Sequence, residues 1–164
     1  MMSEVTPLTQ LGRAFGFTPE DLQANRARRI TQHQRQNLNS LFVRTVLVGV
    51  FLLLLPAVVG LALVAWQGGD LLSLQGMLGL LIGLILFIFY SVANYRDYAL
   101  FLDLSRGTVE IITGKIERSG AYLNVGRHQF LLEEAKLDLI QSGLRYTFYY
   151  LPVSKRIIGV EFAE

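Results

Sequence analysis

The chain has 164 residues, of which 52% are hydrophobic, and its mean hydropathy is positive. This composition is too apolar for an ordinary soluble domain of this length and indicates a membrane protein. The net charge of +2 gives no sign of nucleic-acid binding, and the absence of cysteine excludes disulfides, thiolate zinc sites and cysteine nucleophiles.

The N-terminal part of the chain carries start and stop signals for two helices. A short helix is predicted over residues 6–15, with Gly16 as its terminator. A second helix is predicted to begin at Thr18, a good N-cap that is followed by proline at the first helical position. This second helix is predicted to run toward Leu38 and to continue into an apolar stretch.

A cluster of arginines lies between the second helix start and the first apolar stretch: Arg26, Arg28, Arg29 and Arg35. The leading interpretation is a membrane-surface segment, because basic residues beside a span attract anionic lipid headgroups. A docking helix for a cytoplasmic partner is the alternative. A helix-turn-helix is set aside because too little chain precedes the turn to form its supporting helix.

Two uncharged stretches have the length of membrane spans. Residues 45–66 include Pro56 in the middle and end at Trp66. Residues 74–95 contain no Asp, Glu, Lys, Arg or His. At about 1.5 Å per residue, each stretch can cross a hydrocarbon core about 30 Å thick. The linker 67–73 is short, so the two helices are predicted to form an antiparallel hairpin.

The orientation of this hairpin is predicted from its flanking charges. Six arginines precede the first span and Arg96 follows the second, whereas the linker has no basic residue. Basic residues stay on the cytoplasmic side, so both termini are predicted to be cytoplasmic in a multi-pass protein of the bacterial inner membrane.

Three glycines on the second span, Gly76, Gly79 and Gly83, fall close to one stripe of the helix. Small residues at this spacing let another helix backbone approach closely. Packing against the first span is the leading interpretation, and contact with a second copy or another membrane protein is the alternative. Neither span has charged residues that could form an ion path.

The C-terminal residues change to the alternation typical of strands. Strands are predicted over residues 98–104, 108–117, 122–125, 128–132, 144–151 and 156–162, with one short helix over 133–141. Gly114 inside the second of these strands predicts a bulge or a sharp bend.

The predicted fold class is therefore an α+β membrane protein. A cytoplasmic helical segment (1–40) precedes a transmembrane hairpin (41–95), and a cytoplasmic β-rich domain (96–164) follows. The strand order favours a curled sheet or a small barrel of the OB or SH3-like kind, with one short helix.

Residues that could carry chemistry are few in the β-rich domain. His128 has no second histidine or cysteine nearby, and the adjacent Glu133 and Glu134 point in different directions on a helix. Motifs of phosphate loops, nucleophile elbows and zinc proteases are absent from the sequence. We therefore predict no enzymatic activity, no cofactor and no metal site.

One predicted strand is aromatic on both faces. Tyr146, Phe148 and Tyr150 alternate with Thr147 and Tyr149. One face is expected in the core, and the other is either packed or forms a recognition surface. Balanced charge in this domain argues against nucleic acid as the ligand.

Two stretches, residues 17–25 and 146–158, resemble segments of uncharacterised bacterial membrane proteins that have a two-helix hairpin and a small β domain. The layout is also similar to that of NfeD-like proteins. That resemblance, which is one of architecture, implies an OB-type domain after transmembrane helices and a link to membrane-protein quality control.

The leading functional hypothesis is a non-enzymatic, membrane-anchored binding or adaptor protein, whose partners are the lipid bilayer and a protein or a second copy of the chain. The alternative is an accessory subunit of a transporter or another membrane complex, acting through its transmembrane helices. A third hypothesis is that the basic N-terminal helix senses anionic lipid headgroups.

Overall fold

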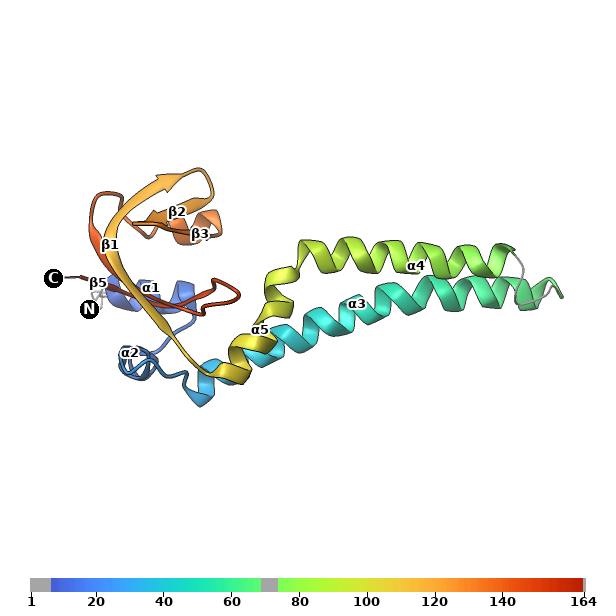
Figure 1. The fold of residues 1–164 in the computed structure, drawn as a ribbon, viewed down its shortest axis with the longest axis horizontal. Coiled ribbons are helices and arrows are strands. Elements are labelled where there is room, and N and C mark those ends of the chain that lie inside the picture. The colour runs from blue at the N-terminus through green and yellow to red at the C-terminus, as the bar shows by residue number, and fades with distance from the viewer. Residues whose placement is uncertain (1–6, 69–73, 164) are drawn as a thin grey trace, which may run out of the picture. The chain divides into compact units, whose positions relative to one another are not determined.

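The structure is a computed structural model that describes residues 7–68 and 74–163 (Figure 1). The helices are α1 (Pro7–Phe15), α2 (Pro19–Arg26), α3 (Gln32–Trp66), α4 (Leu74–Ala93), α5 (Tyr95–Arg106) and α6 (Glu134–Leu137). The strands are β1 (Glu110–Ser119), β2 (Tyr122–Val125), β3 (His128–Leu131), β4 (Arg145–Tyr150) and β5 (Ile157–Phe162). The fold is α+β, with a long apolar helix and a small antiparallel sheet of five strands.

The chain forms two compact units. Residues 7–38 and residues 102–163 belong to the first, and residues 39–101 make up the second. Residues 1–40 and 96–164 are predicted as separate segments, so the folding of the two chain ends into one unit differs from the prediction. The reason is that these contacts join residues far apart in sequence, which no local pattern encodes.

The sheet has the strand order β3-β2-β1-β4-β5, in which β1 is the central strand and pairs with both β2 and β4. Residues 110–115 of β1 pair with β4, and residues 116–119 pair with β2. Figure 1 shows β1 as a long strand that bends between these halves. The ring of Phe130 on β3 lies 5.1 Å from that of Tyr150 on β4, although β2 and β1 separate these strands in the sheet. The sheet is therefore curled.

Gly114 lies where β1 curls, but it forms no bulge. The pairing with β4 continues in register through Gly114 and Tyr146, and the irregularity in the sheet lies instead between Tyr149 and Tyr150. A Cβ on Gly114 would lie 3.0 Å from the Cγ1 of Val125. The predicted bulge is therefore wrong, whereas the predicted bend agrees with the place where β1 changes partner from β4 to β2, and Val125 leaves little room there for a side chain.

The strand boundaries agree with most of the sequence prediction, but the first predicted strand is wrong. Residues 98–104 belong to the helix α5. Leu100 and Asp103, three residues apart, are both fully buried, which is a helical spacing. The predicted helix 133–141 is reduced to the single turn of α6.

Helices α1 and α2 pack against β5. The predicted signals are confirmed: Gly16 has a φ of +72°, and Thr18 forms a capping box with Asp21 at the start of α2. The prediction that α2 runs to Leu38 is wrong. α2 ends at Arg26, the chain turns through Arg28 at a φ of +57°, and α3 begins at Gln32.

Candidate functional site

The second unit presents an apolar surface along both of its long helices. α3 has no charged residue from Thr45 to Trp66, and α4 has none over its whole length. Large side chains point outward on both helices: Phe51 is 59% exposed and Phe89 is 72% exposed. An exposed apolar surface of this extent marks a region that another apolar phase or molecule covers.

The glycines of α4 lie against α3. A Cβ on Gly79 would be 2.7 Å from the carbonyl oxygen of Pro56, and one on Gly83 would collide with the carbonyl oxygen of Leu53. Position 83 thus lies opposite 53 and position 79 opposite 56, so the helices run antiparallel and side by side, as Figure 1 shows. The surroundings of Gly76, also a predicted packing residue, lie outside what the structure describes.

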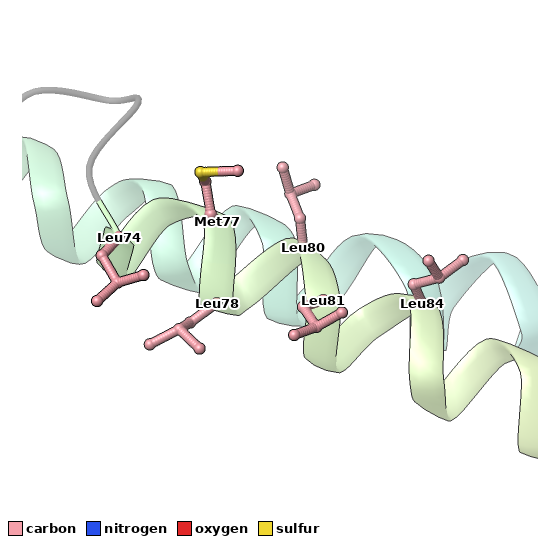
Figure 2. A pocket seen from close by; sticks show the side chains of 6 residues that line it. All are labelled: Leu74, Met77, Leu78, Leu80, Leu81 and Leu84. Atoms are coloured by element: carbon pink, nitrogen blue, oxygen red, sulfur yellow. The ribbon is translucent and has the colours of Figure 1, made fainter.

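The outward face of α4 carries a shallow apolar groove with a volume of about 420 Å³. Figure 2 shows that all the side chains lining it project from α4 itself: Leu74, Met77, Leu78, Leu80, Leu81 and Leu84. The six described side chains that line the groove are all apolar, so it suits an apolar occupant such as an acyl chain.

By length and composition, α3 is the one helix within residues 7–68 and 74–163 that meets the requirement for crossing a membrane by itself. The segments Met77–Ala93 and Tyr95–Arg106 meet it together as a pair that is bent by 63°. The described residues thus contain one candidate span, or two if this bent pair counts as one.

The predicted membrane-surface arginines take part in the folding of the first unit. Arg26 forms an ion pair with Glu161 on β5 at 2.5 Å, and Arg35 donates a hydrogen bond from Nη2 to the carbonyl oxygen of Leu104. Arg29 pairs with Thr108 through an isolated β-bridge. Arg28 and Arg29 are exposed and remain available for an anionic surface.

A hydrogen-bonded seam joins α2 to β5 around the Arg26 pair. Tyr149 donates a hydrogen bond to Glu161 at 2.5 Å. Burial by itself raises the pKa of Glu161, but the hydrogen bonds from Arg26 and Tyr149 and the charge of Arg26 outweigh it, so the pKa lies below 4.5. Burial and the bond to Glu161 raise the pKa of Tyr149 to about 12.

Asp21, in the first turn of α2, links α2 to the residues at the start of α3. Its carboxylate accepts hydrogen bonds from the backbone N–H of Thr18 and from the hydroxyl of Thr31, and it contacts His33 Nδ1 at 3.1 Å. Burial raises the pKa of Asp21, but these hydrogen bonds outweigh that effect and hold it below 3.8. The carboxylates of Asp21 and Glu161 are therefore both ionised at neutral pH.

The predicted recognition strand is not a surface. Tyr146 and Phe148 are 0% exposed and Tyr150 is 2% exposed, and Tyr149 on the opposite face is also buried. The first three lie on the inner side of the curled sheet with Phe130, and Tyr149 lies under α2. The hypothesis of a recognition surface at these residues is wrong, and the alternative of core packing is right.

His128 lies beside Tyr150 without forming a metal centre. Its Nδ1 is 3.5 Å from the hydroxyl of Tyr150, which donates to Glu110 at 2.5 Å. Burial and this bond to Glu110 raise the pKa of Tyr150. Among residues 7–68 and 74–163, no three His, Asp or Glu side chains gather in a way that could hold a metal ion.

A different part of the sheet presents apolar side chains to the surface. Tyr122 on β2 and Leu131 on β3 face each other across the strands, and they are 43% and 46% exposed. β3 is an edge strand, which pairs with β2 alone among the described strands. This patch is not predicted from the sequence, because both residues belong to short strands whose outer faces cannot be told from their inner faces before the curl is known.

Comparison of the chain with known protein families, with curated proteins and with solved structures gives no match.

Proposed function

We propose that the protein is a membrane-anchored binding protein, in which α3 and α4 cross the bilayer as a hairpin and hold the first unit at the cytoplasmic face. The exposed apolar surface of both helices supports this proposal, since it has no other cover among the described residues. α4 meets the requirement for a span only together with α5, and its own 20 residues, at about 1.5 Å each, amount to about 30 Å, the thickness of the hydrocarbon core.

The folding of both chain ends into one unit carries the proposal. Residues 7–38 and 102–163 pack together, and an ion pair joins Arg26 to Glu161 across 135 positions of sequence. We infer from this packing that both ends lie on the same side of the membrane, in which case the segment between them crosses an even number of times. If α3 crosses, α4 returns.

Alkaline washing of isolated membranes tests the anchor. The full-length chain is expected to stay in the membrane pellet through the wash and to enter solution only with detergent, because apolar helices hold it there. Recovery of the chain in the soluble fraction would contradict the proposal.

The binding role is proposed for the patch of Tyr122 and Leu131. Its support is an exposed apolar pair beside an unpaired strand edge, the kind of surface that another chain can cover. The face of Gly79 and Gly83 is less suited to a partner, because α3 occupies it. This favours the adaptor hypothesis over the accessory-subunit hypothesis.

A photo-crosslinking residue placed at Tyr122 in living cells tests this patch. We expect one discrete covalent adduct at Tyr122, with none from the same probe at Glu20, an exposed position on α2. Equal labelling at both positions, or none at Tyr122, would count against a partner at the sheet.

A further inference from the structure

Helix α5 exposes three of its large apolar side chains, whereas Leu100 and the acid Asp103 are fully buried. Tyr95 is 62% exposed, Phe101 is 60% exposed and Leu102 is 47% exposed. At about 100° per residue these three lie within one arc of about 120° on the helix. Tyr98 lies in the same arc, but its hydroxyl is buried near Gly49 of α3. Three large exposed apolar side chains on one arc are not typical of a helix that faces water.

The acids of α5 are used inside the protein. Asp97 accepts a hydrogen bond from the hydroxyl of Thr45 at 3.2 Å. Asp103, which is 0% exposed, accepts hydrogen bonds from the backbone N–H groups of Val153 and Ser154 at 2.9 and 2.8 Å. The contact of Asp97 faces inward within the second unit, and the contacts of Asp103 face inward within the first, whereas Tyr95, Phe101 and Leu102 are exposed.

The position of α5 in the chain indicates what covers that apolar side. α4 ends at Ala93, and Asn94 breaks the helix while its side chain donates to the carbonyl oxygen of Tyr90 at 2.9 Å. The bend between α4 and α5 is 63°. Figure 1 shows this change of direction after α4. Val92, at the end of α4, is 68% exposed, so the apolar surface continues from α4 into α5.

We infer that α5 is an interfacial helix, which lies along the phospholipid bilayer with Tyr95, Phe101 and Leu102 at the boundary between headgroups and acyl chains. Tyrosine suits this boundary because its ring is apolar and its hydroxyl is polar. Arg106 ends the helix with an exposed cation that can meet lipid phosphate. This inference rests on the proposed membrane hairpin.

Tryptophan fluorescence in proteoliposomes tests the depth of α5. The chain has one tryptophan, so Trp66→Phe gives a silent background, into which Phe101→Trp places a single reporter. With lipids brominated at shallow or deep acyl positions, we expect Phe101→Trp to be quenched more strongly by the shallow bromines. Tyr95→Trp is a second reporter with the same expectation.

Two control reporters separate failure of this inference from failure of the hairpin. Leu80→Trp, on the outer face of α4, is expected to be quenched by deep bromines, and Tyr122→Trp, in the sheet, is expected to escape quenching. Quenching of Leu80→Trp without quenching of Phe101→Trp and Tyr95→Trp would overturn the interfacial helix and leave the hairpin standing. Deep quenching of the α5 reporters would also overturn it, since α5 would then be embedded. Absence of quenching at Leu80→Trp would overturn both.

Discussion

At the residue scale, the contact between Asn25 and Gly159 sets how closely α2 approaches the sheet. A Cβ on Gly159 would lie 2.9 Å from Asn25 Nδ2 and 3.1 Å from Leu22 Cδ2. Asn25 is 0% exposed, and neither polar atom of its amide has a hydrogen-bond partner. An unpaired buried amide lowers stability, so Asn25 fills space at a cost that an apolar side chain would not have.

We therefore predict opposite effects for two substitutions on α2. Asn25→Ala should leave the free energy of unfolding unchanged or raise it by about 1 kcal/mol, because it removes two unsatisfied groups and suits a helix. Leu22→Ala should lower it by about 2–5 kcal/mol, because it opens a cavity in the core. Thermal unfolding in detergent, followed by near-ultraviolet circular dichroism of the tyrosines, measures both. A loss of more than about 1 kcal/mol in Asn25→Ala would show that the amide has a partner in solution.

The contacts of Glu161 with Arg26 and Tyr149 make the stability of the first unit depend on pH. The folded state holds the pKa of Glu161 below 4.5, so the unfolded chain binds a proton more readily than the folded one at acidic pH. The stabilisation from Glu161 is thus complete above its ordinary pKa and is lost as the pH falls through the folded value.

We predict that the melting midpoint falls between about pH 6 and about pH 3, and that Glu161→Gln makes this fall smaller. At neutral pH the substitution should cost about 1 kcal/mol, because the Arg26 side chain is 64% exposed and its ion pair is screened by solvent. Glu117→Gln, at an exposed carboxylate on β1, is the matched control and should leave the pH dependence as it is in the wild type. An identical acid dependence in wild type and Glu161→Gln would refute the role of this carboxylate.

At the element scale, the local patterns predicted most strands and the helix starts, since these depend on nearby residues. Thr18 and Gly16 are examples, and β2 has the predicted bounds. α5 was mistaken for a strand because a short apolar run has no clear period. Its helical spacing is evident only when Leu100 and Asp103 are seen to be buried together.

The packing of α4 on α3 leads to a prediction about Gly83. Gly83→Leu should lower the melting midpoint of the helices, because even a Cβ at this position meets the Leu53 carbonyl, and overpacking costs about 1–3 kcal/mol or more. Val92→Leu, which adds volume on the exposed side of the same helix, should have little effect. Circular dichroism at the helix band, measured in detergent, compares the two. Equal midpoints would mean that the helices do not pack through this face.

At the scale of the whole molecule, the sequence predicted two apolar helices and a β-rich end, but it did not predict which parts fold together. The ion pair of Arg26 with Glu161 and the bridge of Arg29 with Thr108 join distant segments, and neither has a local signal. The same holds for the aromatic strand: Tyr146, Phe148 and Tyr150 are buried because the sheet curls and brings Phe130 against them, and no local signal predicts that curl.

Single-cysteine labelling in intact cells tests the two-span hairpin most directly, because the natural chain has no cysteine to remove. Cysteines would be placed at the exposed positions Gln23 on α2, Gln67 after α3 and Ser119 on β1. We predict that a membrane-impermeant maleimide labels Gln67→Cys in intact cells, and that it labels Gln23→Cys and Ser119→Cys only after the inner membrane is opened. Labelling of Gln23→Cys and Ser119→Cys from opposite sides would contradict the account, since the two chain ends could then not fold into one unit.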